Sequence, residues 1–246
     1  MSSTSGPESG PAQFLSTRWS LVASLKHAEE PRARAALTEL CELYWTPLYA
    51  FLRRRGLDSH AAADTVQGFF AELVEKRNFG ELSSDRGRFR SFLLAALSHH
   101  LSHERARAGA QKRGGGVRVV AIDPVDADER LQIATTGETS PEQAFEREWA
   151  LSLLARALAA VRADYETDGK DELFALLRPA LQGAELSDVA GIAAKAGMTE
   201  GAVRVAATRL RKRYREALRG LIRDTVEHEH EVDAEIADLF RALGGR

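Results

Sequence analysis

The chain has 246 residues, a formal net charge of −2, 44% hydrophobic residues and a single cysteine. This length exceeds one typical domain, so two small domains are expected. No stretch approaches the roughly 18 apolar residues that a membrane span requires, so membrane insertion is not expected. Cys41 alone cannot form an internal disulfide, which favours a reducing, cytoplasmic location.

The charged residues are distributed unevenly along the chain. Residues 86–113 carry seven Arg or Lys and one acid, and residues 204–223 carry eight basic residues and one acid. Residues 123–148 carry eight acids and two arginines, and residues 224–246 carry seven acids and two arginines. One basic block alone would be a solvated helix face, but two on separate domains indicate two contacts with a polyanion.

Three amphipathic helices are predicted in the N-terminal half, after a Ser/Gly/Pro-rich segment (1–16) that we expect to be disordered. The first helix ends at Gly56, and Asp58 or Ser59 can cap the second. The third follows a loop at 78–86 and becomes densely basic before three consecutive glycines end it. The apolar positions are Leu40, Tyr44, Leu48 and Phe51 in the first helix, Val66, Phe69, Phe70 and Leu73 in the second, and Phe89, Phe92, Leu93 and Leu97 in the third.

Residues 114–139 have weak periodicity and mixed polar composition, which predicts a flexible linker. The linker ends at Ser140-Pro141-Glu142-Gln143, where Ser can cap a helix, Pro fits the first turn and Gln reaches back to the cap. Two further helices are predicted from their apolar spacing. They carry Phe145, Trp149, Leu153, Leu154, Ala157, Leu158 and Val161, and then Leu173, Phe174, Leu176, Leu177 and Leu181.

A short helix, a turn and a longer helix are predicted next. The short helix ends at Gly197, which supplies the backbone freedom of a tight turn, and Thr199 can cap the longer one. Small Ala193 lets the two helices cross closely. This order is typical of a helix-turn-helix, which places its second helix in the DNA major groove. The inward positions of that second helix are Val203, Ala206, Ala207, Leu210, Tyr214, Leu218 and Leu221.

The opposite face of the second helix is predicted to contact DNA. Its front can reach base edges, with Arg204 the candidate for direct reading, while its later basic residues can hold phosphates. The candidate residues for this contact are Thr199, Glu200, Arg204, Thr208, Arg211, Lys212 and Arg215.

The N-terminal helices resemble the region-two domain of extracytoplasmic-function (ECF) sigma factors of the sigma-70 family. Residues 63–73, ADTVQGFFAEL, are similar to the family's polymerase-binding helix, and residues 86–94, RGRFRSFLL, to its promoter-melting segment. The helix-turn-helix at 188–215 resembles region four, which reads the minus-thirty-five element. The likeness is greatest to a subgroup that has Thr17-Arg18-Trp19-Ser20 near its start and a basic, glycine-rich end to region two.

The resemblance implies an all-α fold of two small helical domains joined by a flexible linker. Its boundaries are 17–113 for region two, 114–139 for the linker, 140–223 for region four and 224–246 for an acidic extension. It implies core RNA polymerase and promoter DNA as partners, and leaves room for an anti-sigma or other regulatory protein. It assigns polymerase binding to Asp64, Gln67 and Glu72. It assigns minus-ten recognition and melting to Arg86, Arg88, Arg90, His103, Arg107, Lys112 and Arg113.

Three features depart from the family pattern. The segment 162–183 is longer and more polar than the usual stretch before region four. Gly68 stands where the polymerase-binding helix usually has an acid. The acidic extension lies outside the common core. Its apolar residues predict an amphipathic helix that docks either on the protein itself or on a regulator, and these residues are Val226, Val232, Ile236, Leu239 and Phe240. Phe89 and Phe92, although they lie among arginines, have the spacing of core residues. Strand capture is therefore expected from the loop at 79–88 and the exposed arginines.

Other classes of function fit less well. No P-loop, nucleophile elbow, dinucleotide fingerprint or cysteine pair occurs, so neither an enzyme nor a cofactor is expected. His99, His100 and His103 with Glu104 do not match a zinc-protease motif, so no metal site is expected. A helix-turn-helix regulator with an N-terminal effector or dimerisation domain is the main alternative, although its non-DNA domain need not be basic. A purely protein-binding adaptor is the second, and the basic outer face at 204–215 argues against it.

Overall fold

The structure is a computed structural model that describes residues 30–75, 88–108, 139–182, 186–226 and 228–244. All regular elements in these ranges are helices, as the sequence predicts. The predicted disordered segment 1–16, the loop 78–86 and the linker up to residue 138 lie outside the described residues. Among the described helices, none is long and apolar enough to cross a membrane.

Three helices form the N-terminal part, namely α2 (Glu30–Arg54), α3 (Ser59–Glu75) and α4 (Phe89–Ala108). Gly56, at φ 89°, turns the chain after α2. Asp58 then caps α3, because its Oδ1 accepts a hydrogen bond from the Ala61 amide at 2.8 Å. The ring of Tyr44 packs edge-on against Phe89 with centroids 5.3 Å apart, which joins α2 to the start of α4.

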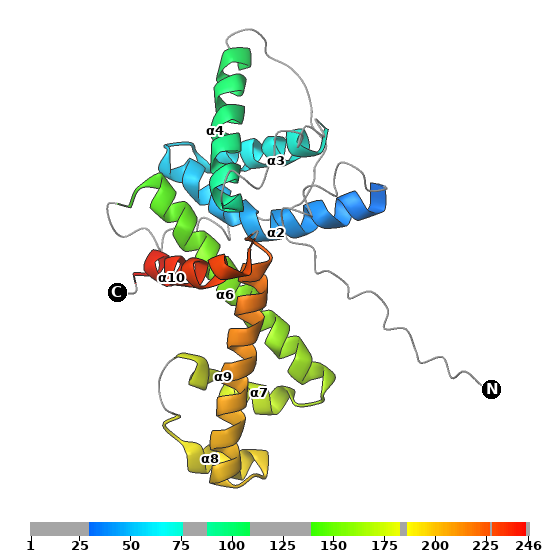
Figure 1. The fold of residues 1–246 in the computed structure, drawn as a ribbon, viewed down its shortest axis with the longest axis vertical. Helices are drawn as coiled ribbons and strands as arrows, with labels where there is room; N and C mark the ends of the chain where they lie inside the picture. Colours follow the sequence, from blue (N-terminus) through cyan, green and yellow to red (C-terminus); the bar gives the residue numbers. More distant parts are fainter. Residues whose placement is uncertain (1–29, 76–87, 109–138, 183–185, 227, 245–246) are drawn as a thin grey trace, which may run out of the picture.

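Two long helices connect the two ends of the molecule. α6 (Pro141–Thr167) and α9 (Glu200–Arg223) run in opposite directions and pack against each other (Figure 1). α6 begins with the predicted capping box, in which Ser140 Oγ accepts from the Gln143 amide at 3.2 Å and Gln143 Oε1 accepts from the Ser140 amide at 2.9 Å. Tyr214 of α9 donates its hydroxyl to the Leu154 carbonyl of α6 at 3.3 Å.

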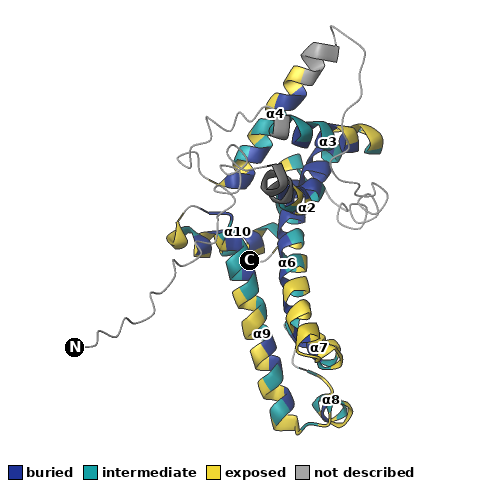
Figure 2. Cartoon of the chain, turned by 90° about the vertical axis from the view of Figure 1, so that its right-hand side faces the viewer, coloured by how far each residue is buried: buried dark blue, intermediate teal, exposed yellow. Residues whose placement is uncertain are grey.

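The buried residues form two clusters, visible as dark blue on the inner faces in Figure 2. The upper cluster joins α2, α3 and α4 to the first half of α6, including Phe145 and Trp149, and to the end of α9. The lower cluster joins the second half of α6 and the first half of α9 to α7 (Asp171–Leu177), η3 (Arg178–Gln182) and α8 (Val189–Ala196). The sequence predicts a domain boundary before Ser140, whereas α6 and α9 each cross from one cluster to the other.

The acidic extension docks on the protein itself. η4 (Glu229–Glu231) leads into α10 (Val232–Ala242), which packs against α6 and α9 beneath the N-terminal helices (Figure 1). Val232 and Leu239 are fully buried in the upper cluster, and Ile236 packs against it. The sequence places Phe240 on the same apolar stripe, but this is wrong: directly after buried Leu239, about 100° around the helix, Phe240 is 53% exposed and faces away from that contact. The predicted amphipathic helix therefore buries its apolar stripe within this chain.

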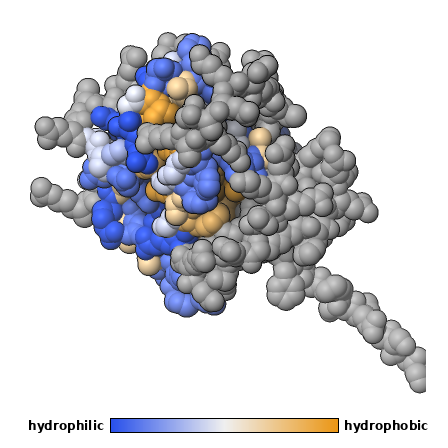
Figure 3. All heavy atoms as spheres, turned by 90° about the horizontal axis from the view of Figure 1, so that it is seen from above, coloured by the Kyte–Doolittle hydropathy of each residue, from blue (hydrophilic) through white to orange (hydrophobic). Residues whose placement is uncertain are grey.

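Cys41 lies in the upper cluster and is 1% exposed. Burial, and then the neighbouring Glu42 carboxylate, raise the pKa of its thiol to about 12, so the group is a neutral thiol at neutral pH. Figure 3 views the same end of the molecule from above, where hydrophilic side chains border a smaller apolar area.

Candidate nucleic-acid interface

The turn between α8 and α9 has the geometry that a helix-turn-helix needs. Gly197 adopts the left-handed conformation, at φ 62° and ψ 33°, which a side chain would strain. Its amide and that of Met198 both donate to the Ala193 carbonyl, which closes α8. Thr199 then begins α9, because its Oγ1 accepts from the Ala202 amide at 3.2 Å. The turn and cap are those predicted from the sequence.

A second glycine fits the start of α8. Asp188 caps this helix through Oδ1, which accepts from the Gly191 amide at 2.8 Å. A Cβ on Gly191 would lie 2.1 Å from the Asp188 carboxylate, so only glycine leaves room for this cap as it stands.

The apolar stripe of α9 fixes which side chains face outward. Val203, Ala207 and Leu210 are at most 2% exposed and pack with Ala193 of α8 in the lower cluster. At about 100° per residue, the opposite face of α9 points into solvent at the end of the molecule remote from α4 (Figure 2). This face can approach a DNA groove without unpacking the core.

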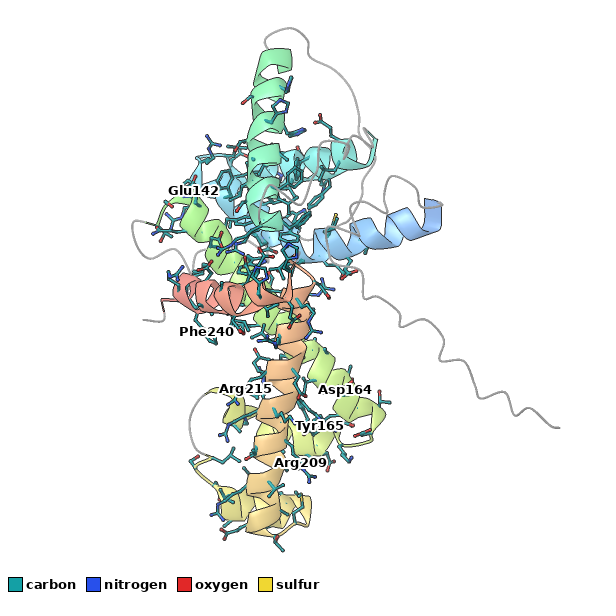
Figure 4. All side chains as sticks on the ribbon, in the orientation of Figure 1. Glu142, Asp164, Tyr165, Arg209, Arg215 and Phe240 are labelled. Carbon is teal, nitrogen blue, oxygen red and sulfur yellow. The ribbon has the colours of Figure 1, made fainter. Side chains whose placement is uncertain are left out.

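Most of the predicted upstream-contact residues lie on the exposed surface. Arg204 pairs with Glu200 at 3.1 Å and Lys212 with Glu216 at 3.8 Å, and all four side chains are more than half exposed. Such exposed pairs contribute little stability, about 0–1 kcal/mol, so a phosphate can replace the carboxylate at small cost. Thr208 donates to the Arg204 carbonyl at 3.0 Å. Thr199 and Arg215 are also exposed, and Figure 4 labels Arg215 together with Arg209 on α9.

Arg211 has a structural contact that the sequence did not indicate. Its Nε donates to the Ala180 carbonyl of η3 at 2.9 Å, and the side chain is partly buried. This hydrogen bond ties η3 to α9 in the lower cluster. Arg211 therefore differs from Lys212 and Arg215, whose charged groups lie in solvent.

Val205 is an outward residue that the sequence analysis missed. It follows buried Val203 by two residues, about 200° around the helix, and is 51% exposed. It lies beside Arg204 and one turn before Thr208 and Arg209 on the surface proposed to meet DNA. An exposed aliphatic side chain here can contact a thymine methyl group, as apolar residues do in major-groove recognition. The spacing of two residues from inward-facing Val203 could have predicted that Val205 faces outward.

The predicted melting segment is only partly exposed in this structure. The sequence places Arg90 on a DNA-facing surface, whereas the structure leaves it 4% exposed. Its Nε lies 2.8 Å from Glu146 of α6, and its Nη1 pairs with Glu235 of α10. Its guanidinium also stacks over the Trp149 ring, 4.3 Å from the centroid. Arg90 thus joins α4, α6 and α10, because a buried guanidinium requires charged partners.

Arg88 is 43% exposed in its side chain and also faces α10. Its Nε lies 2.8 Å from Glu235, and its Nη1 pairs with Asp238. Burial raises the pKa of Glu235, against the attraction of Arg90 and then of Arg88. Burial would also raise the pKa of Asp238, but Arg88 and Arg241 outweigh it and leave this pKa below its ordinary value.

The remaining predicted melting residues lie farther along the basic block. His103 is exposed, and its Nε2 lies 3.1 Å from that of His99. The backbone of Arg107 belongs to α4, but its side chain is outside the described part of the chain. Arg86, Lys112 and Arg113 also lie outside the described residues. The structure thus shows Arg88 and Arg90 together at the start of α4 and places His103 more than three turns farther along that helix.

The predicted polymerase-binding residues all lie on α3. Val66, Phe69 and Phe70 are buried, which leaves Asp64 exposed and Gln67 partly exposed, in agreement with the predicted inward face. Glu72 differs, since its carboxylate contacts Nδ1 of buried His100 on α4 and its side chain is 24% exposed. Asp64 is therefore the most accessible of the three candidates.

Comparisons with protein-family models, with curated proteins and with solved structures return no match for this chain. Within the described residues there is no group of three or more His, Cys, Asp or Glu that could hold a metal ion.

Proposed function

We propose that the chain is a sigma factor, which binds core RNA polymerase and directs it to promoters by contacting DNA at two places. The observation that carries this proposal is the helix-turn-helix of α8 and α9, whose outer face is exposed and basic at Arg204, Lys212 and Arg215. A helix N-terminus favours nearby phosphate, and the residues of its first turns reach base edges. Thr199 and Arg204 occupy those turns.

The N-terminal part supports this function over that of a simple DNA-binding regulator. α3 presents exposed Asp64 over a buried apolar face, and its sequence resembles the polymerase-binding helix of ECF sigma factors. The start of α4 brings Arg88 and Arg90 together, in the segment that resembles the family's promoter-melting region. A sensor domain of a regulator would have no need for a second basic segment.

Dependence on polymerase tests the proposal. The chain has a net charge of −2, and its two basic segments, 86–113 and 204–223, are separated by an acidic one. Few phosphates are neutralised at either place, so the protein alone should bind duplex DNA weakly at physiological salt. Together with core polymerase it should form a tight, sequence-specific complex, measured by gel shift with competitor DNA.

The same measurement separates the two candidate functions. Tight and specific binding by the protein without polymerase would overturn the proposal and favour the helix-turn-helix regulator. If no specific DNA complex forms with or without polymerase, the result would overturn the proposal and favour an adaptor that binds only proteins.

A further inference from the structure

An acidic face of α10 covers the start of α4. Glu235 lies 2.8 Å from Nε of Arg88 and also pairs with Nη1 of Arg90. Asp238, one turn farther along α10, pairs with Nη1 of Arg88 and lies 3.4 Å from Nη2 of Arg90. Each of the two carboxylates therefore contacts both arginines.

The charged groups of this cluster are matched in number. Glu146 of α6 adds a third carboxylate 2.8 Å from Arg90, and Arg241 adds a third guanidinium that pairs with Asp238. Three carboxylates thus stand against three guanidiniums. Binding to a nucleic acid draws on uncompensated positive charge, because each neutralised phosphate releases its counterions. With α10 docked, Arg88 and Arg90 offer little such charge to a strand.

The apolar stripe of α10 holds its acids in this place. Val232 and Leu239 are fully buried, and Glu235 lies three and four residues from them on the same helix face. At the start of the extension, Asp233 and Glu229 pair with Arg219 of α9 at the solvent surface. α10 therefore lies docked across α6 (Figure 1), with the carboxylates of Glu235 and Asp238 turned inward, 2% and 12% exposed.

We propose that α10 is an autoinhibitory clamp, in which Glu235 and Asp238 occupy the guanidiniums of Arg88 and Arg90 in place of a DNA strand. The inference rests on the proposed function, because that function assigns both arginines to the melted strand. Arg90 is 4% exposed, so it becomes accessible only when α10 moves away. Arg88 is already 43% exposed and has only to exchange a carboxylate for a phosphate.

Charge removal from the clamp tests this competition in the full chain. The variant Glu235→Gln with Asp238→Asn neutralises the two carboxylates that face the arginines. The control, Glu229→Gln with Asp233→Asn, removes the same charge from the same extension but releases Arg219 and Arg223 of α9 instead. Both are compared with the unaltered chain for binding of a short fluorescein-labelled single-stranded DNA, followed by anisotropy over a range of salt. Thermal unfolding is measured in parallel.

The clamp predicts that the Glu235/Asp238 variant binds the strand several-fold more tightly than the control does. Its salt dependence should steepen by about 0.7 in log–log slope for each arginine released, and Arg88→Ala in the same background should remove part of the gain. A variant that only melts at a lower temperature, with no gain over the control, would show that α10 is structural and would overturn the clamp.

A milder variant keeps the test decisive if the double variant does not fold. Asp238→Asn leaves Glu235 and Glu146 paired with Arg90, and Asp233→Asn is its matched control. Tighter binding for Asp238→Asn alone supports the clamp, and equal binding for the two overturns it. The strand-binding result does not require polymerase. If the clamp fails this test while promoter binding still depends on polymerase, only the clamp is overturned and the proposed sigma-factor function stands.

Discussion

At the scale of single residues, the outward side chains of α9 divide by position into two kinds of proposed DNA contact. Arg204 lies in the second turn, near the helix end that would enter a groove in the proposed complex, and its exposed pair with Glu200 is easily exchanged. Lys212 lies two turns farther on, is 76% exposed in its side chain and faces solvent. The first position suits a base edge and the second a phosphate.

Replacing each residue by alanine should separate the two roles. Arg204→Ala should cost roughly 1–3 kcal/mol and relax the preference at one or two upstream promoter positions. Lys212→Ala should weaken all upstream sequences alike and lower the salt slope by about one. Promoter-library transcription with each variant at two salt concentrations measures both effects. An Arg204→Ala protein with unchanged upstream preference would remove this residue from the base-reading set.

Asp64 is the residue at which the polymerase contact can be tested. It is exposed on α3 over buried Val66 and Phe69. Asp64→Arg should weaken association with core polymerase while leaving the unfolding free energy within about 0.5 kcal/mol, as exposed substitutions usually do. Asp164→Arg, an exposed charge reversal on α6 near the helix-turn-helix, is the matched control (Figure 4). Copurification of Asp64→Arg at the level of this control would contradict the assignment.

Single-residue predictions from the sequence succeed where a helix stripe decides the outcome and miss partners that arrive from elsewhere in the chain. The burial of Val203, Ala207 and Leu210 follows from spacing alone. Arg90 is buried because Glu146 and Glu235, 56 and 145 residues away in the chain, meet it in space. No local sequence pattern indicates contacts between residues so far apart in the chain, so a charged residue in a basic block is predicted to be exposed.

At the scale of elements, the turn between α8 and α9 depends on one backbone conformation. Gly197→Ala places a side chain in the left-handed region, at a cost of about 1–2 kcal/mol, which should lower Tm by roughly 2–8 °C. Gly201 is the matched control, because it lies inside α9 with nothing within 4 Å of an added Cβ. Gly201→Ala should raise stability by about 0.5–1 kcal/mol. Equal shifts in Tm for the two variants, measured by circular dichroism, would contradict the turn geometry.

Helix boundaries were the most predictable feature of the elements, because each cap is a short-range interaction. The Ser140–Gln143 capping box, the Asp58 cap and the Thr199 cap all form between residues three apart. The docking partner of α10 was left open by the sequence. Its amphipathic pattern specifies an apolar stripe but not the helices that cover it. These helices are α6 and α9, and only the tertiary fold brings them together against α10.

At the scale of the whole molecule, α6 and α9 make the two clusters interdependent. Phe145, Trp149 and Leu153 of α6 are fully buried in the upper cluster with α2, α3 and α4. The sequence assigned these residues to a separate C-terminal domain, because composition changes sharply at the linker. A change of composition along the chain does not decide which helices share a core.

Fragments of the chain should show that the N-terminal helices need α6 to complete their core. A fragment of residues 1–139 lacks the apolar side chains that α6 contributes to the upper cluster. Burial of each large one stabilises the fold by about 1.5–3 kcal/mol. This fragment should therefore melt without a cooperative transition. A fragment of residues 1–167 restores α6 and should regain one, measured by circular dichroism and tryptophan fluorescence. A cooperative transition in the shorter fragment would show that the N-terminal helices form a domain without α6.

Multi-round transcription in vitro tests the central claim most directly. Purified core polymerase is incubated with a library of promoter fragments, with this protein or with its Arg204→Ala variant. Transcripts that start at defined sites only when the unaltered protein is present, and from a changed set of upstream sequences with Arg204→Ala, are the predicted result. Transcription that is independent of the protein, or repression by it of starts made by polymerase with another initiation factor, would contradict the assignment.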